Sequence, residues 1–165
     1  MKKNISIIGL TNSFKKSIAK KLADELEMVF ADVNDLMEYN LINDEMLAVA
    51  GQDYYNKNER KTLETVLSYQ NTVLTVNFST LNKLNNFDIL KQNSLIIYVA
   101  LNYADFQNLS QQEYDNNVLK LNQIVFNDRD LIMRKYADIV VEVNHLTLNN
   151  VIEKTLDSIG KYYKI

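Results

Sequence analysis

The segment GLTNSFKKS, at residues 9–17, follows a short apolar run and opens an amphipathic stretch. A loop that wraps a phosphate group at such a place reads G-x-x-x-x-G-K-[ST]. Gly9 and Lys15 fit this pattern, whereas Phe14 replaces the second glycine and Lys16 replaces the hydroxyl residue. The chemistry in question is phosphate binding by backbone N–H groups and a lysine ammonium.

Both replacements weaken the phosphate-binding interpretation. The second glycine lets the main chain adopt positive φ and approach the phosphate, and the side chain of Phe14 disfavours this. A hydroxyl at position 16 would ligate Mg²⁺, whereas the ammonium of Lys16 offers no lone pair and repels a metal ion. Ser17 comes one residue too late for the hydroxyl position. A shifted pattern, with Lys16 and Ser17 as its last two residues, would need a glycine where Lys15 stands. We therefore prefer a helix N-terminus with surface lysines.

Other polar residues follow later apolar runs, at residues 32–35, 77–80 and 101–103. The carboxylate of Asp32 is of the type that takes a proton from a hydroxyl or supports Mg²⁺. The same side chain would also cap a helix that begins near Asn34 without any catalytic role. The residues alone leave both interpretations of Asp32 open.

Hydrophobic patterning predicts how these residues are positioned. Short runs rich in Val and Ile indicate buried parallel strands, and the stretches between them have helical periodicity. The strands are expected at Ile5–Ile8, Met28–Ala31, Thr72–Val76, Ser94–Ala100 and Ala137–Val143. The helices are expected at Ser13–Glu27, at Asn34–Ala50 as two short helices, and at Tyr54–Ser68, Leu81–Lys91 and Val151–Tyr162.

This alternation predicts an α/β fold, in which a five-stranded parallel sheet lies between two layers of helices. The length of 165 residues suits a single domain over 1–165. Ligands of such sheets bind beyond the carboxyl ends of the strands, where the polar stretches fall.

Composition excludes several classes of function. The net charge of −3 argues against a nucleic-acid partner, and the absence of cysteine excludes disulfide and thiolate chemistry. The single histidine, His145, cannot build a zinc site alone. The apolar run in MKKNISIIGL is too short for a signal peptide or a membrane span. We therefore expect a cytoplasmic protein without a membrane partner.

The order and spacing of these segments resemble the shikimate kinase family, small P-loop members of the nucleoside-monophosphate-kinase-like group. The resemblance covers nearly the whole chain. Two segments resemble motifs of the family: FADVNDLMEY (30–39) resembles F-x-D-x-D-x-x-I-E, and GQDYYNKNE (51–59) resembles G-E-x-x-F-R-x-x-E. Two others resemble its strands: NTVLTVNFST (71–80) resembles a strand followed by G-G-G, and SLIIYVAL (94–101) resembles the strand before the lid. The last, FNDRDLIMRKYADIVVEV (126–143), resembles R-x-x-x-Y-x-x-x-A-D with the last strand.

The resemblance implies a P-loop kinase fold with ATP and Mg²⁺ as cofactors, and it assigns roles by position. The phosphate-binding positions are Gly9, Ser13, Lys15, Lys16 and Ser17. Lys15 and Asp32 take the catalytic positions, and Asp32 also takes the position that supports Mg²⁺. Asn34, Asn56 and Arg129 take the substrate-binding positions.

Several of these positions depart from the family pattern. Asn34 replaces the aspartate that would hold the substrate hydroxyls, and Asn56 replaces the arginine that would bind its carboxylate. Arg60, one helical turn from Asn56, is the alternative for that arginine. The glycine triplet is replaced by Asn77-Phe78-Ser79, in which Phe78 is expected to fill space.

The lid is predicted to be short. The stretch SQQEYDNNVLKLNQ (110–123) contains no arginine, and Asn117 falls nearest to the lid arginine of the family. Arg129 keeps the position of the substrate-carboxylate arginine, although an ion pair with Asp128 or Asp130 is the alternative role for it.

The first functional hypothesis is a shikimate-kinase-like protein with lost or strongly impaired catalysis, which acts as a binding or regulatory protein. Its ligand would be a small anion or nucleotide held by Lys15, Lys16 and Arg129. The second hypothesis is an active, divergent kinase of shikimate or a similar hydroxylated metabolite. The third is a protein-interaction module without nucleotide, such as a homodimer. The shape of residues 9–17 discriminates among these hypotheses. An open loop with its N–H groups facing inward favours phosphate binding, whereas a loop plugged by Phe14 or by a lysine side chain favours the interaction module.

Overall fold

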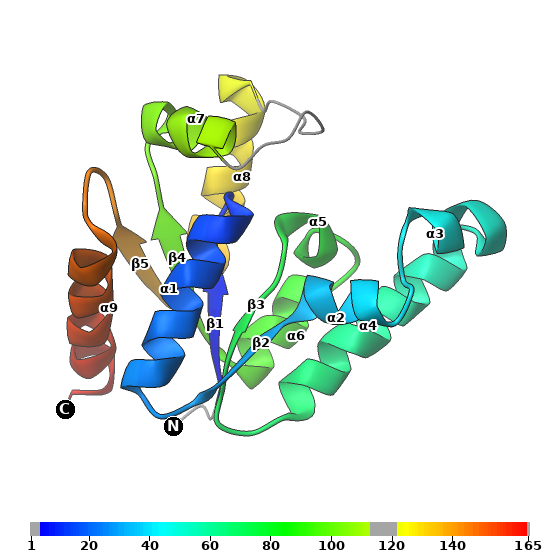
Figure 1. Ribbon diagram of the computed structural model, residues 1–165, viewed down its shortest axis with the longest axis horizontal. Helices are drawn as coiled ribbons and strands as arrows, with labels where there is room; N and C mark the ends of the chain where they lie inside the picture. Colours follow the sequence, from blue (N-terminus) through cyan, green and yellow to red (C-terminus); the bar gives the residue numbers. More distant parts are fainter. Residues whose placement is uncertain (1–3, 113–121, 165) are drawn as a thin grey trace.

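The computed structural model describes residues 4–112 and 122–164 of the chain. Five strands form one parallel sheet in the order β2-β3-β1-β4-β5. They are β1 (Ile5–Ile8), β2 (Val29–Asp32), β3 (Thr72–Thr75), β4 (Leu95–Ala100) and β5 (Ile139–Glu142). Figure 1 shows helices on both faces of this sheet. The predicted three-layer α/β/α architecture is therefore confirmed.

Helices connect consecutive strands, and a last helix follows β5; those within residues 103–136 were not among the predicted helices. The helices are α1 (Asn12–Glu25), α2 (Val33–Tyr39), α3 (Asp44–Ala50), α4 (Gln52–Ser68), α5 (Phe78–Leu81), α6 (Asn86–Asn93), α7 (Tyr103–Gln112), α8 (Gln123–Tyr136) and α9 (Leu148–Tyr163). The two short helices expected within residues 34–50 are α2 and α3. Gly51, with φ +91°, joins α3 to α4 in a conformation that residues with a Cβ rarely adopt.

The helix predicted at Leu81–Lys91 is wrong in one respect, because the structure divides this stretch into α5 and α6. Leu84 lies between the two helices with φ +49° and is 83% exposed. The asparagines beside it favour a turn over a continuous helix. The consequence is that α5 directly follows β3 as a short helix at the sheet edge.

The core consists of two apolar clusters, one on each face of the sheet. Ile7 packs on one face with α1 and α9, whereas its neighbour Ile8 packs on the other face with α4 and α6. Successive side chains of a strand point to opposite faces, so a strand covered on both sides reads as continuously apolar. Burial on both faces thus explains the apolar runs from which the strands were predicted.

None of the helices in residues 4–112 and 122–164 is long and apolar enough to span a membrane. The predicted lid falls largely on residues 113–121, which lie outside the described part of the chain, as does Asn117. The short lid therefore stays a prediction.

Candidate functional site

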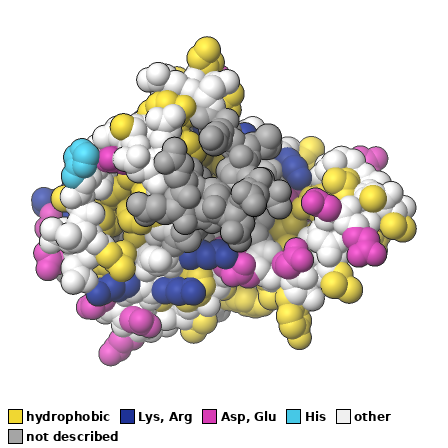
Figure 2. All heavy atoms as spheres, turned by 45° about the horizontal axis from the view of Figure 1, so that its top comes forward, with side chains coloured by type: hydrophobic (Ala, Val, Ile, Leu, Met, Phe, Trp, Pro, Cys, Tyr) yellow, Lys and Arg dark blue, Asp and Glu magenta, His cyan; other side chains and the backbone are white. Residues whose placement is uncertain are grey.

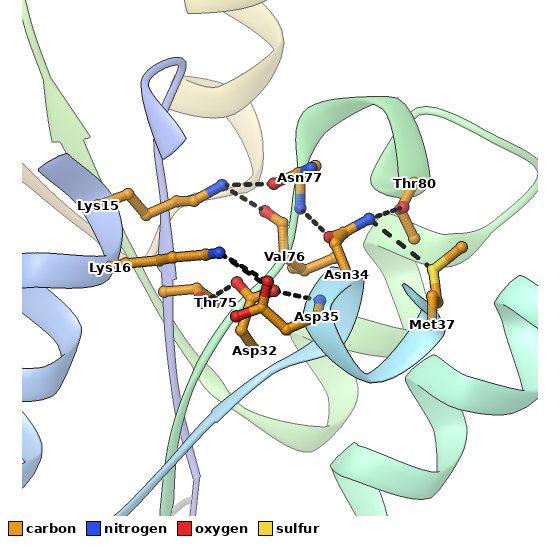
Figure 3. Close-up of polar contacts among 10 residues, drawn as sticks. All are labelled: Lys15, Lys16, Asp32, Asn34, Asp35, Met37, Thr75, Val76, Asn77 and Thr80. Carbon is orange, nitrogen blue, oxygen red and sulfur yellow. Dashed lines mark hydrogen bonds and ion pairs between the residues drawn. The ribbon is translucent and has the colours of Figure 1, made fainter. Parts of the chain in front are cut away.

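The polar stretches after β1, β2 and β3 meet at the carboxyl edge of the sheet (Figure 3). Lys15 and Lys16 extend from the first turns of α1 toward the ends of the neighbouring strands. Asp32 ends β2, and Asn77 follows β3. Hydrogen bonds among these side chains confirm that residues far apart in the sequence converge here as predicted.

The segment 9–17 is mostly helical. Helix α1 begins at Asn12, with Thr11 as its N-cap, and the amide of Lys15 already donates to the Thr11 carbonyl at 3.2 Å. Position 14 therefore has helical backbone, in which a bulky side chain is tolerated. Phe14 packs against the core and helps to line a hollow of about 210 Å³ near α7.

Gly9 is required for close packing at the end of β1. A Cβ at this position would lie 3.0 Å from Cγ2 of Val99 and 3.4 Å from its carbonyl oxygen. The first glycine of the pattern is therefore explained here by the approach of β4, independently of any ligand.

Lys15 is fully buried. Its ammonium donates to the carbonyl oxygen of Val76 at 3.2 Å and to Oδ1 of Asn77 at 3.1 Å. The interpretation of Lys15 as a surface lysine is therefore wrong. The physical reason is that the end of β3 supplies acceptors, which make burial of the ammonium tolerable.

Lys16 forms an ion pair across the site. Its ammonium is 2.8 Å from Oδ1 of Asp35 and 4.0 Å from Oδ1 of Asp32. The Lys16 side chain is 28% exposed, so this pair is partly screened by solvent. A cation of the chain itself thus lies beside the two carboxylates that follow β2.

Asp32 has a structural role that occupies both of its carboxylate oxygens. Oδ1 accepts from the amide of Asp35 at 2.7 Å and so caps α2, and Oδ2 accepts from the buried hydroxyl of Thr75. Asp32 and Thr75 are register partners of the β2–β3 pair. The N-cap interpretation is confirmed, whereas a role for Asp32 in catalysis or metal binding stays a prediction.

Asn34 is held by the N-terminal end of α5. Its Oδ1 accepts from the amide of Asn77 at 2.8 Å, and its Nδ2 donates to the hydroxyl of Thr80 at 3.0 Å. That hydroxyl donates to the buried carboxylate of Glu59 at 2.9 Å, which also pairs with Lys83 at 2.9 Å. The amide at the substrate-aspartate position is therefore part of an internal polar network.

Arg129 lies over the ring of Phe78, with the guanidinium carbon 4.9 Å from the ring centroid. Among the described residues no carboxylate lies within 4.0 Å of it, so an ion pair with Asp128 or Asp130 is wrong. Asp130 instead pairs with Arg134 at 2.9 Å. Phe78 is buried and fills space, as expected.

The remaining predicted positions are on α1 and α4. Asn56 is half-buried on α4 and accepts from Gln52 at 2.7 Å, in an open groove of about 540 Å³ along that helix. Arg60 pairs with Glu64 at 2.8 Å and bonds Asn85, so its contacts are structural. Ser17 is exposed. The side chain of Ser13 lies outside what the structure describes.

Sequence reasoning missed Asp35 and Thr75. Asp35 occupies a variable position of the F-x-D-x-D-x-x-I-E pattern, and Thr75 is hidden in an apolar strand. Both residues follow from their relation to Asp32. Asp35 is the residue whose amide Asp32 caps, and Thr75 is the cross-strand partner of Asp32.

The residues present do not fit a magnesium ion. Each oxygen of Asp32 already accepts one hydrogen bond, and the Lys16 ammonium lies 4.0 Å from its Oδ1. No group of three or more potential ligands gathers within the described ranges. On the face drawn in Figure 2, the Lys and Arg side chains of the described residues are interspersed with Asp and Glu side chains.

Comparison with known proteins places the chain in a family. The family model for shikimate kinase matches residues 12–160. The shikimate kinase of Sulfurihydrogenibium sp. is 24% identical over 165 residues, covering 96% of this chain and 99% of the relative. That of Dehalococcoides mccartyi is 26% identical over 172 residues, covering 98% of this chain and 96% of the relative.

Solved structures agree on the fold. The shikimate kinase of Acinetobacter baumannii in complex with shikimate has a TM-score of 0.80 at 20% identity, covering 98% of this chain and 94% of that chain. The shikimate kinase of Aquifex aeolicus has a TM-score of 0.76 at 16% identity, covering 97% and 98%. The chain belongs to the shikimate kinase family.

Proposed function

We propose that this protein has lost, or strongly reduced, the phosphoryl transfer of its family and that it acts by binding a small anion or nucleotide, in a binding or regulatory role. The observation that carries the proposal is that the polar groups at the carboxyl edge bond one another. Lys15 bonds the end of β3, Lys16 pairs with Asp35, and Asn34 is held by Asn77.

Activation of a substrate hydroxyl is the first requirement that is not met. A base near the hydroxyl must accept its proton, and the amide of Asn34 cannot do so. The carboxylate of Asp32 is nearly fully buried, and its oxygens accept from Asp35 and Thr75. Asn34 therefore supplies no base, and each oxygen of Asp32 is already held by a hydrogen bond of the fold.

Stabilisation of the transferred phosphoryl group is the second requirement. It depends on cations that close around the phosphates, among them an arginine in many kinases. Residues 110–123 contain no arginine, and position 16 carries an ammonium in place of a metal-ligating hydroxyl. Because α1 already begins at Asn12, the backbone is not drawn out into a long phosphate-wrapping loop.

Binding of an anion is compatible with the same arrangement. Lys15, Lys16 and Arg129 place three cationic groups on elements that meet at this edge, beside the N-terminus of α1. Helix N-termini carry partial positive charge and favour anions. ATP, which the family uses, and smaller phosphate compounds are the ligand classes that follow.

The test is a coupled assay of ADP release with ATP, Mg²⁺ and shikimate, run beside the Acinetobacter baumannii shikimate kinase. Each lost charge contact costs about 10²–10³ in rate, and combined losses are less than additive, so kcat/KM should be lower by about 10⁴ or more. A value within tenfold of the reference enzyme would contradict the proposal. Calorimetric titration with ADP and ATP then measures binding separately from turnover.

A divergent active kinase is the second candidate, and Arg129 favours it. This arginine has no carboxylate partner within the described residues, and it keeps the family position for binding the substrate carboxylate. Two results together would select this candidate. The wild type would turn over shikimate, and its saturable binding of shikimate would be lost in the Arg129→Ala variant.

A further inference from the structure

Lys16 lies where the family resemblance expects a hydroxyl that ligates Mg²⁺. Its ammonium extends from α1 toward the carboxylates after β2, 2.8 Å from Oδ1 of Asp35 and 4.0 Å from Oδ1 of Asp32 (Figure 3). The chain thus brings a positive charge of its own to the place that a divalent cation would need.

The positive charge of Lys16 is matched by a neighbouring carboxylate. Lys16 replaces a neutral hydroxyl residue, and Asp35 adds a carboxylate at a variable position, one residue after the aspartate that Asn34 replaces. The resulting pair joins α1 to the first turn of α2. The backbone amide of Asp35 also donates the capping hydrogen bond to Oδ1 of Asp32.

A divalent metal ion would find few ligands beside this pair. Mg²⁺ needs near-octahedral oxygen coordination, usually with one or two carboxylates. Asp32 already accepts from Thr75 and the amide of Asp35, and Asp35 accepts from Lys16. Any ion that approached would also meet the charge of the Lys16 ammonium.

We propose that Lys16 permanently replaces the divalent cation of this site, so that the protein binds its phosphate-bearing ligand in metal-free form. The ligand class rests on the proposed function above, whereas the exclusion of the metal rests on the contacts of Lys16 alone. Lys16 offsets the charge of Asp35 and Asp32, and a phosphate therefore needs no metal bridge to approach these carboxylates.

The first experiment measures Mn²⁺ binding by electron paramagnetic resonance, without nucleotide. It compares the wild type with Lys16→Thr, which restores a hydroxyl, and Lys16→Gln, which keeps the length and removes the charge. Lys20→Thr is the matched control, because exposed Lys20 lies on the same helix over the ring of Phe30, whereas Asp32 and Asp35 form their ion pairs with Lys16. Circular dichroism melts verify that each variant is folded.

Removal of a unit charge about 4 Å from a divalent ion should tighten Mn²⁺ binding by about thirtyfold even at the dielectric constant of water. We expect this gain in both Lys16 variants and no gain in Lys20→Thr. Equal Mn²⁺ affinity of the wild type and the Lys16 variants overturns the proposal, whether all of them bind or none does.

The second experiment titrates ADP by calorimetry, in EDTA and in excess Mg²⁺. We expect the wild-type dissociation constant not to tighten in Mg²⁺, whereas that of Lys16→Thr tightens. Wild-type affinity that rises tenfold or more in Mg²⁺ overturns the proposal. Absence of heat in both buffers contradicts nucleotide as the ligand of the proposed function, and the Mn²⁺ result still decides the role of Lys16.

Discussion

Substitution of Asp32 separates its structural role from a catalytic one. In Asp32→Ala, helix α2 loses its N-cap, which costs about 1 kcal/mol. The hydroxyl of Thr75, fully buried, loses its acceptor, which costs about 1–3 kcal/mol. The ammonium of Lys16 is 4.0 Å from Asp32 and partly exposed, so the loss of the interaction between these two charges adds little. The free energy of unfolding should therefore fall by about 2–4 kcal/mol.

Two further variants make this prediction specific. Asp32→Asn keeps a capping oxygen, since asparagine caps helices as well as aspartate, and should cost about 1 kcal/mol. Asp35→Ala removes only the partner of Lys16, because the capping bond uses the backbone of Asp35, and should cost at most about 1 kcal/mol.

Urea denaturation followed by circular dichroism measures all three variants. An unchanged dependence on urea concentration indicates that the difference is one of stability alone. If Asp32→Ala is as stable as Asp35→Ala, the reasoning is refuted, because Asp32 would then contribute no more than a surface carboxylate.

Two more predictions concern the frame that holds the site. Asn4 is buried, donates to the carbonyls of residues 67 and 69 at 3.2 and 2.8 Å, and accepts from the amide of residue 72 at 3.1 Å. Asn4→Ala should therefore lower the free energy of unfolding, measured by urea denaturation, by about 2–3 kcal/mol. Burial, and then the hydrogen bond to Asp130, raises the pKa of Tyr98. The folded state thus keeps a proton that the unfolded chain releases above about pH 10, so stability falls as the pH rises, and alkaline melts should show a smaller fall for Tyr98→Phe.

The sequence was sufficient to predict the sheet and its edge. Apolar runs such as Ile5–Ile8 are buried on both faces, so their pattern survives as continuous hydrophobicity. Because parallel strands end at a common edge, the polar residues after β1, β2 and β3 were predicted to meet, and Lys15, Asp32 and Asn77 do lie there.

The contacts within the site could not be predicted in the same way. The acceptors of Lys15 are at residues 76 and 77, about sixty positions away, and no local pattern indicates that they bury its ammonium. The bond between Asp32 and Thr75 depends on strand register, and strands that are covered on both faces lack the polar–apolar alternation that would reveal it. The pairing of Lys16 with Asp35 likewise depends on how α1 faces α2.

The most direct test of the account is detection of phosphorylated shikimate by ³¹P nuclear magnetic resonance, with protein at a concentration comparable to that of ATP, Mg²⁺ and shikimate. A single turnover per molecule is then visible. The account predicts that any phosphomonoester resonance grows at least about 10⁴ times more slowly than in a sample with an equal amount of the Acinetobacter baumannii enzyme. A resonance that grows within about tenfold of the rate of that enzyme, and that disappears in Lys15→Ala, would contradict the account.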